Sequence, residues 1–341
     1  MTESRIMNQQ LVRQIKSLIN QASRLKHERD FIDPPVPLPG LGSWEDSLHC
    51  VDKLRLLAIS AAASTGRPLF LQGDPGTGKS NLARAAAVLL ERHFMSYVIQ
   101  PFTEYQDLMW TVDHTARLGH AQILGAMGDL SEEAMGQAKS ELNLENYLSP
   151  GPLWWAMDWI DAEKRKCKHD YKPEVEGEYK AAENGVVMLI DEIDKADASL
   201  ANGLLEVLGN GAFSVPFFDH PVRGEIRPLV IITSNDTWEM PKAFIRRCVV
   251  HKLTLPKGEE LVEHLYAIGR AHFDLLDPEV IERAARMIVE DRESVLADDQ
   301  VKTGQAEFVD LLLALSNLDG GKKEQLETCQ SLGRFFFKHD V

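Results

Sequence analysis

The residues best suited to chemistry in this chain lie in a glycine-rich stretch between an apolar run and an alanine-rich segment. The stretch reads Gly73-Asp74-Pro75-Gly76-Thr77-Gly78-Lys79-Ser80, which has the spacing G-x-x-x-x-G-K-[ST]. Its glycines let successive backbone N–H groups face an anion, and the following helix points its positive end at the same place. In loops of this kind, lysine reaches the β- and γ-phosphates and the serine hydroxyl holds Mg²⁺. We therefore predict a nucleotide phosphate site over residues 73–81, with Asn81 as its last member; a glycine-rich turn that binds nothing is the alternative.

Two adjacent carboxylates, Asp191 and Glu192, follow an apolar run that begins at residue 185. A buried strand that delivers acids at its carboxyl end places them where ligands bind in a doubly wound sheet. We expect Asp191 to hold Mg²⁺ through water and Glu192 to act as general base toward the attacking water. Asn235 ends another apolar run, 228–235. It orients that water in one interpretation and closes a turn in the other, and the sequence leaves both open.

Apolar runs that lack polar alternation predict the strands of a parallel sheet covered on both faces. The predicted strands are 69–72, 96–100, the five apolar residues that precede Asp191, 228–235 and 249–255. Helices are expected over residues 6–29, 46–65 and 79–93, because apolar residues recur there at helical spacing. The long stretch 102–183 predicts an insertion, since connections in such sheets are usually short. Residues 213–226 predict a hairpin with exposed prolines.

The predicted organisation has three parts: an N-terminal helix in residues 1–33, a core in 34–256 and a helical unit in 257–341. The proline-rich segment 34–40 is interpreted as a stiff linker at the first boundary. The apolar stripe of the first helix favours packing on the protein's own body or, as the alternative, a partner. Large tryptophans anchor the insertion, and we interpret them as core residues rather than recognition residues; they are Trp110, Trp154, Trp155 and Trp159.

Composition limits the classes of function. The chain has 341 residues, a formal net charge of −15 and 44% hydrophobic residues. An acidic protein is a poor general binder of nucleic acid, although a local basic pore would be compatible with it. The four cysteines form no C-x-x-C pair, and Cys167-Lys168-His169 offers only a weak metal motif. With no apolar run near the ~20 residues that span a bilayer, we expect a cytoplasmic protein without membrane contact.

Taken in this order, the motifs resemble the AAA+ ATPases and, within them, the MoxR-like branch, over roughly residues 45–315. Residues 73–80 resemble Walker A, 189–196 Walker B, 232–235 sensor 1 and 243–248 the arginine-finger segment. Within the insertion, residues 107–110, 113–117 and 147–154 resemble a helix-2 insert of one MoxR-like group, and the 213–226 hairpin resembles a pre-sensor-1 insert.

The resemblance implies an α/β P-loop core whose five parallel strands lie in the order 5-1-4-3-2, followed by a small helical lid. It implies ATP and Mg²⁺ as ligands, with the adenine near residues 48–54. Arg247 resembles an arginine finger that reaches the nucleotide of a neighbouring copy, with Arg246 as its substitute, so we expect a ring, in the form of a hexamer. Lys302 is either the basic sensor 2 residue of the lid or a solvated lysine.

Two classes of function agree with these features. The first is a chaperone-like ATPase that remodels a protein client, in this branch often together with a von Willebrand A-domain protein. The second is a regulatory or scaffold ATPase, or a motor subunit, of a defence or DNA-processing system, resembling McrB-like motors or transposition regulators. Glu192 favours genuine hydrolysis, and the net charge of −15 argues against a DNA-translocating pore.

Overall fold

Five parallel strands form the central sheet of the computed structural model, which describes residues 2–126, 132–165, 173, 179–216, 218–235, 240–294, 303–318 and 321–336. The strands are β3 (Leu69–Gln72), β4 (His93–Val98), β7 (Val186–Asp191), β8 (Leu229–Ser234) and β9 (Val249–Lys252). Their spatial order is β4-β7-β8-β3-β9. Counted along the chain and read from β9, this is the order 5-1-4-3-2, so the predicted α/β fold and strand order are confirmed.

The strand register brings the carboxyl ends of the strands to one edge of the sheet. Gln72 of β3 pairs with Ser234 of β8 and with Lys252 of β9. On the other side, Val98 of β4 pairs with Asp191 of β7. Side chains that follow these strands therefore meet at this edge, although they are far apart in sequence.

The two faces of the sheet are buried against two separate apolar clusters, because alternate strand residues point to opposite sides. Leu69 and Leu71 of β3 join the cluster under the N-terminal helices, and Phe70 joins the cluster on the other face. The helices of the first cluster are α1 (Thr2–Arg24), α2 (Lys53–Thr65) and α3 (Lys79–Leu89), and those of the second include α6 (Pro152–Met157), α9 (Ala198–Asn210) and α10 (Lys242–Ile245).

The first helix packs on the protein's own body. The stripe on α1 lies against α2, with Leu18 and Ala22 each only 1% exposed. Its bounds differ from the predicted 6–29, since the helix ends at Arg24. Beyond it, the ammonium of Lys53 donates a 3.0 Å hydrogen bond to the carbonyl of Leu25, which ties the chain to α2 just after it leaves the helix.

The proline-rich segment 34–40 is not a free linker, and the helix predicted from residue 46 starts later. Here β1 (Val36–Leu38) pairs antiparallel with β2 (Ser47–His49). Val36 and Leu38 are buried while Pro37 faces outward, an arrangement that the edge strand of a small sheet tolerates. The helix α2 begins only after Asp52, whose carboxylate accepts a 2.8 Å hydrogen bond from the N–H of Arg55 as an N-cap.

The helix after the glycine-rich loop, α3, and the second strand of the central sheet, β4, also differ from their predicted ranges. The helix α3 ends at Leu89 instead of residue 93, and β4 starts at His93 instead of residue 96. Glu91 adopts a φ of 51°, which is uncommon for a residue other than glycine and turns the chain between the two elements.

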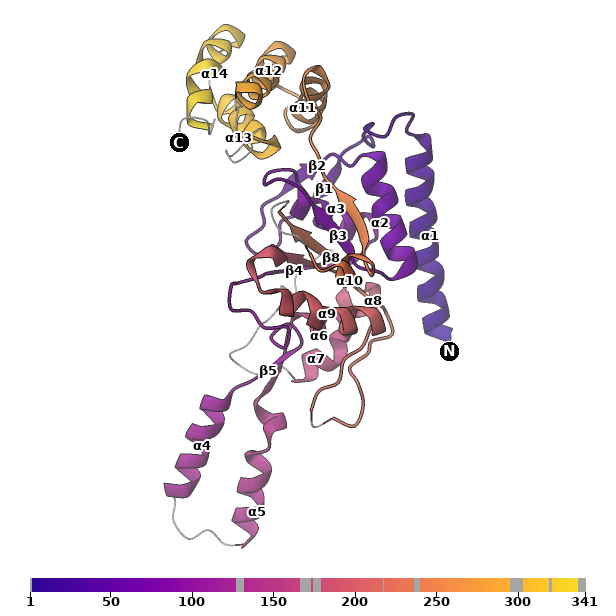
Figure 1. Cartoon of the computed structure of the whole chain (residues 1–341), viewed down its shortest axis with the longest axis vertical. Helices are drawn as coiled ribbons and strands as arrows, with labels where there is room; N and C mark the ends of the chain where they lie inside the picture. Colours follow the sequence, from indigo (N-terminus) through magenta and orange to yellow (C-terminus); the bar gives the residue numbers. More distant parts are fainter. Residues whose placement is uncertain are drawn as a thin grey trace.

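The insertion 102–183 forms a stem and an arm that extends away from the body (Figure 1). The stem is the antiparallel pair β5 (Trp110–Val112) and β6 (Leu148–Pro150), and the arm consists of α4 (His114–Ala126) and α5 (Glu132–Glu141). The same stretch of chain also forms η1 (Leu144–Tyr147), α7 (Trp159–Arg165) and α8 (Ala181–Asn184). The tryptophans pack as predicted: Trp154 and Trp155 are 0% and 3% exposed, and Trp110 and Trp159 lie against the same cluster.

Among the described residues of the predicted 213–226 hairpin, the pairing is a single antiparallel bridge between Phe213 and Val222. Proline lacks the backbone donor that a strand ladder needs, and Pro216 and Pro221 both lie in this segment.

Four helices at the C-terminal end enclose their own apolar cluster. They are α11 (Glu259–His272), α12 (Pro278–Ser294), α13 (Gln305–Ser316) and α14 (Lys322–Phe336), and we refer to them as the lid. No helix among the described residues is long and apolar enough to cross a bilayer.

Candidate active site

The glycine-rich loop curls between β3 and α3 in a shape that its glycines allow. Gly76 and Gly78 have φ values of 75° and 83°, a left-handed region that costs glycine little. At Gly73, an added Cβ would lie 2.5 Å from the carbonyl oxygen of Leu253, so a larger residue has no room. Inside the loop, the hydroxyl of Thr77 donates a 2.8 Å hydrogen bond to the Asp74 carbonyl.

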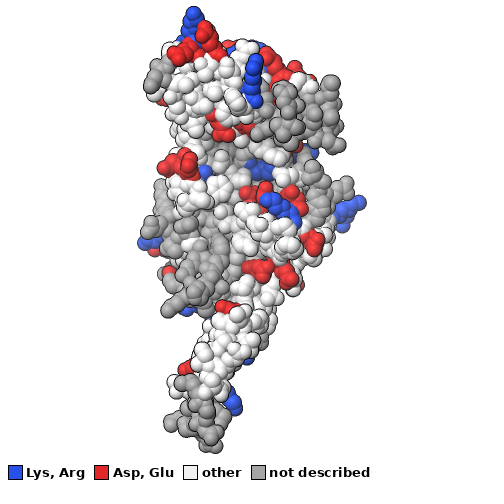
Figure 2. Space-filling view, turned by 90° about the vertical axis from the view of Figure 1, so that its left-hand side faces the viewer, with Lys and Arg blue, Asp and Glu red and all other residues white. Residues whose placement is uncertain are grey.

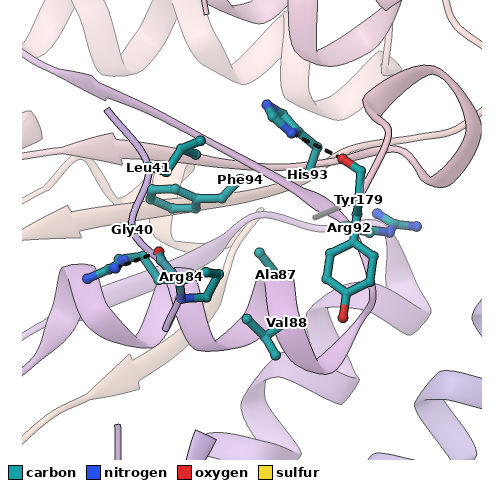
Figure 3. A pocket seen from close by; sticks show the side chains of 10 residues that line it. Gly40, Leu41, Arg84, Ala87, Val88, Arg92, His93, Phe94 and Tyr179 are labelled. Carbon is teal, nitrogen blue, oxygen red and sulfur yellow. Dashed lines mark hydrogen bonds between the residues drawn. The ribbon is translucent and has the colours of Figure 1, made fainter. Parts of the chain in front are cut away.

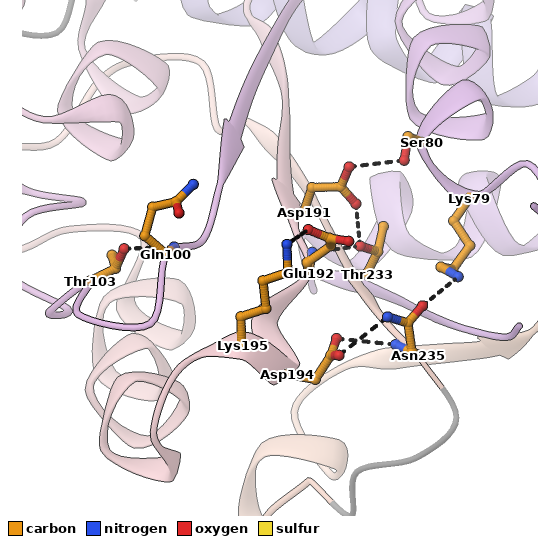
Figure 4. A network of polar contacts seen from close by, with 10 residues as sticks. All are labelled: Lys79, Ser80, Gln100, Thr103, Asp191, Glu192, Asp194, Lys195, Thr233 and Asn235. Carbon is orange, nitrogen blue, oxygen red and sulfur yellow. Dashed lines mark hydrogen bonds and ion pairs between the residues drawn. The ribbon is translucent and has the colours of Figure 1, made fainter. Parts of the chain in front are cut away.

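The ammonium of Lys79 lies between this loop and the end of β8 (Figure 4). Its Nζ atom donates to the carbonyls of Gly73 at 2.6 Å and Asp74 at 3.0 Å, and to Oδ1 of Asn235 at 3.2 Å. The side chain is buried. A cation held here is placed for the phosphate contact that the motif predicts.

Asp191 connects the loop helix to two neighbouring strands. Its Oδ2 accepts a 2.9 Å hydrogen bond from the hydroxyl of Ser80, and its Oδ1 accepts one from the hydroxyl of Thr233. Thr233 in turn accepts a 2.9 Å hydrogen bond from the backbone N–H of Glu192. A hydroxyl and a carboxylate side by side are the hard oxygen donors that Mg²⁺ prefers, and the ion commonly takes only one or two such protein groups beside phosphates and water.

Glu192 is held in an unusual conformation at the end of β7. It has φ 59° and ψ 50°, a left-handed backbone that is strained for a residue other than glycine. Its carboxylate forms an ion pair with Lys195 (Figure 4). The hydrogen bond within this ion pair, together with the negative charge of Glu192, raises the pKa of Lys195 above its ordinary value. The strain marks Glu192 as a candidate functional residue.

The orientation of the Asn235 amide is determined by Asp194. The carboxylate of Asp194 accepts from the backbone N–H of Asn235 at 3.1 Å and from its Nδ2 at 3.3 Å. As a result, Oδ1 of Asn235 faces Lys79. The side chain therefore belongs to the polar network, which agrees with its interpretation as the residue that orients a water.

These groups line one cavity of about 480 Å³. Its walls come from β2, the glycine-rich loop, the ends of β7 and β8, and two lid helices: Ser47, Leu48, His49, Pro75, Gly76, Thr77, Gly78, Lys79, Ser80, Asn81, Asp191, Glu192, Asn235, His272, Gln305, Ala306, Val309 and Asp310. Leu48 and His49 fall in the predicted adenine region 48–54. The volume and the donor set fit a Mg²⁺-nucleotide.

The sequence reasoning named the segments that contain Thr233 and His49 without giving either residue a role, and it missed Gln305 altogether. His49 is 2% exposed, and its Nε2 has no hydrogen-bond partner among the residues that the structure describes. Burial lowers the pKa of His49 well below its usual value, and the nearby Arg55 adds to the effect, so the imidazole is neutral at pH 7. Gln305 belongs to no spaced motif, so no signal in the sequence pointed to it.

The paired arginines lie elsewhere. Arg246 and Arg247 are exposed, and neither is among the described residues that line the 480 Å³ cavity. Arg247 lines a second cavity of about 230 Å³ beside Arg67 and Arg227. This cavity lies where β3 and β9 begin, at the opposite edge of the sheet from the loop.

Two other predicted positions fall outside the described residues. They are Lys302, the expected sensor 2 residue, and the Cys167-Lys168-His169 motif.

A third cavity beside β4 has a structural explanation (Figure 3). It measures only about 50 Å³, far below the size of a nucleotide pocket. The guanidinium of Arg84 donates to the carbonyls of Pro39 at 3.0 Å and Glu45 at 2.7 Å, and it lies 5.2 Å from the ring of Trp44. These contacts hold the β1–β2 connection on α3.

Comparison with known proteins decides the family. The family model described as AAA domain (dynein-related subfamily) matches residues 68–248, which include the loop, both acids and the paired arginines. This chain belongs to that AAA family. AAA domains are ATPase modules that bind nucleotide, typically with Mg²⁺, and commonly assemble into rings. Among curated protein sequences, none matches the chain.

Solved structures overlap with this AAA chain only loosely. The P216G mutant of Thermotoga maritima RuvB is 15% identical, with 82% of this chain and 68% of that chain covered and a TM-score of 0.43. Another Thermotoga maritima structure, described as the RuvB Holliday junction branch migration motor, is 15% identical, with 82% of this chain and 67% of that chain covered and a TM-score of 0.41. A candidate ATPase of Cytophaga hutchinsonii is 14% identical, with 97% of this chain and 77% of that chain covered and a TM-score of 0.38. Similarity at this level says nothing about the activity of this chain.

Proposed function

We propose that this chain is a MoxR-like AAA+ ATPase that hydrolyses ATP in a cytoplasmic ring, of hexameric form, and remodels a protein client. The observation that carries the proposal is the separation of two sets of residues. Lys79, Asp191, Glu192 and Asn235 converge at the carboxyl ends of the strands, whereas Arg247 lies at the other edge of the sheet. One copy then holds the hydrolytic groups, and the arginine is available to the next copy.

Within one copy, each residue has a defined task in the proposed reaction. Lys79 and the loop N–H groups would hold the β- and γ-phosphates, and Ser80 and Asp191 would hold a Mg²⁺ ion, which would supply positive charge for phosphoryl transfer. Glu192 accepts a proton from the attacking water, which Asn235 orients. Thr233 positions both acids through its two hydrogen bonds.

The proposed ring supplies a guanidinium from the neighbour. A trans arginine contributes about 10³–10⁵-fold to phosphoryl transfer in related chemistry. Arg247 is our candidate and Arg246 its substitute, because both are exposed and neither has a carboxylate partner among the described residues. We propose the same division into parts as before: residues 1–33, 34–256 and 257–341.

A mixing experiment tests the shared site. We expect Lys79→Ala and Arg247→Ala to be inactive alone, the first without nucleotide binding and the second with it. Mixed in one ring, the intact nucleotide site of one variant meets the intact arginine of the other, so part of the ATPase activity should return. Arg223→Ala, at another exposed arginine, is the control and should keep full turnover. A mixture that stays inactive, although mixed rings form, contradicts the trans arginine.

The α4–α5 arm is the proposed contact with the client. Leu118 and Ile123 on α4 are 61% and 62% exposed, and α4 has no buried residue. Figure 2 shows mostly uncharged side chains on the side of the arm that faces the viewer. Exposed apolar side chains on a projecting element favour a protein partner. A von Willebrand A-domain protein is our first candidate.

Capture of a client protein tests the proposed role of the α4–α5 arm separately from the shared nucleotide site. The Glu192→Gln variant should retain ATP and trap a protein client, and adding Leu118→Ser with Ile123→Ser should release it while nucleotide binding stays unchanged. If DNA instead stimulates the ATPase and no protein is retained, the alternative of a DNA-processing motor gains precedence.

A further inference from the structure

We propose that Gln305, the first residue of the lid helix α13, is the lid's contact with the terminal phosphate of the bound nucleotide. The contact would then be made by a neutral amide instead of a cation. This inference rests on the proposed nucleotide binding and assigns the residue through which the lid detects it.

Gln305 is a buried polar residue whose carbonyl oxygen is left unpaired by the described part of the chain. The residue is 9% exposed, and its Oε1 has no hydrogen-bond partner among the described residues. It lines the 480 Å³ cavity together with Lys79 and Ser80. Leaving a buried acceptor unpaired is unfavourable, so an amide kept here indicates a group that the cavity receives from outside the protein.

The start of α13 lies against the tip of the glycine-rich loop. A Cβ added to Gly76 would be 3.5 Å from the Cβ of Ala306, and one added to Gly304 would be 3.5 Å from the carbonyl oxygen of Pro75. Next to this tip, the carbonyl of Asp74 accepts from Lys79 at 3.0 Å. Because a P-loop lysine reaches the β- and γ-phosphates, Gln305 is at the terminal-phosphate end of the cavity.

The chemistry of the first turn of α13 suits a neutral contact. A glutamine amide has two N–H donors beside its carbonyl, and a half-turn of its flat end group exchanges them, so Gln305 can donate to a phosphate oxygen. The nearest charged side chains of the helix are acidic: Glu307 accepts a 2.8 Å hydrogen bond from the N–H of Gly304, and Asp310 lines the cavity. Within residues 303–310 the lid offers the phosphates a hydrogen bond and helix N–H groups, and no positive side chain.

Binding measurements on the full chain test the proposal. With Mg²⁺ present, Gln305→Leu should lower the affinity for a non-hydrolysable ATP analogue about tenfold, the usual effect of one hydrogen bond to a charged group. The affinity for ADP should change by less than twofold. Gln305→Glu should lower the affinity for the analogue further, because a carboxylate repels the phosphate. Gln325→Leu, on the lid helix α14, should leave both affinities unchanged. Thermal unfolding reports whether each variant is folded, and Gln305→Glu serves as the test if the leucine variant does not fold.

The rival contact is Lys302, so Lys302→Met belongs in the same series. The proposal is overturned if Gln305→Leu and Gln305→Glu bind the analogue as the unaltered chain does, or if only Lys302→Met loses the preference for the analogue over ADP. If the unaltered chain binds neither nucleotide, the proposed function fails and this inference fails with it. Binding by the unaltered chain together with unchanged Gln305 variants overturns the inference alone.

Discussion

The hydroxyl of Thr233 donates a hydrogen bond to Oδ1 of Asp191, although 42 residues separate the two in sequence. Thr233 is fully buried and also accepts from the N–H of Glu192. One side chain of β8 therefore positions the carboxylate proposed to hold Mg²⁺ and the backbone of the proposed general base. A hydroxyl that holds reactive groups in place in this way orients them without touching the substrate itself.

Removing this hydroxyl should slow turnover. We expect Thr233→Val, which keeps the shape of the side chain, to lower kcat about 10–100-fold, the usual cost of losing a hydrogen bond that orients a metal ligand, with little change in nucleotide affinity. Steady-state ATPase assays and binding titrations measure the two effects. Thr111→Val, in the arm stem, is the control, and an unchanged kcat for Thr233→Val would show that the two hydrogen bonds do not support the reaction.

Neutralising the proposed general base should separate binding from hydrolysis. We expect Glu192→Gln to lose about 10²–10⁴-fold in turnover, the usual range for general acid–base catalysis, while it still binds ATP. Single-turnover hydrolysis and equilibrium binding give the two values. Glu206→Gln changes an exposed glutamate on α9 in the same way and should keep full activity. Turnover in Glu192→Gln within twofold of the unaltered chain would assign the base elsewhere.

Truncating Trp154 should destabilise the fold. Its ring packs edge-on against Phe213 and Phe218, with centroids 5.8 Å away in each case, and its Nε1 donates to Asp161 at 3.1 Å. Trp154→Ala would leave a large cavity, so we expect a loss of about 3–5 kcal/mol in the free energy of unfolding. Chemical denaturation measures it. Phe102→Ala is the contrast, because that side chain is 94% exposed and its loss should cost less than about 0.5 kcal/mol.

The free energy of unfolding should fall in mild acid, because burial keeps His264 in its neutral form. His264 lies 5.2 Å from the ring of Phe31, and burial, followed by the charges of Arg55 and Arg29, lowers its pKa to about 3. The unfolded chain has a histidine pKa of about 6.5 and takes up the proton first, so stability is full above pH 6.5 and is lost as the pH falls toward 3.

For this one residue, the expected loss between pH 7 and pH 5 is about 2 kcal/mol. Denaturation at several pH values should show that His264→Phe flattens this dependence, while His27→Phe, at an exposed position, leaves it unchanged. Equal slopes for His264→Phe and the unaltered chain would refute the assignment. The lowered pKa values of His49, His251 and His272 act in the same direction, so part of the dependence should remain.

Local spacing in the sequence determined the features that short segments encode by themselves. The glycines and Lys79-Ser80 specify a phosphate loop, because a tight turn and a helix start depend on residues next to one another. The apolar runs predicted the strands for a similar reason, and the resemblance to AAA+ proteins predicted their order, which the structure confirms.

Only the tertiary structure decided how distant segments meet. The pairing of β1 with β2 replaced a predicted linker, Thr233 and His49 gained roles that their predicted segments did not specify, and Gln305 joined the site without any motif to announce it. Their roles depend on strand register and on how the lid packs against the loop, and these contacts leave no fixed spacing in the chain. The physical reason is that a hydrogen bond between strands, or an unpaired amide in a cavity, is determined by which surfaces the fold brings together.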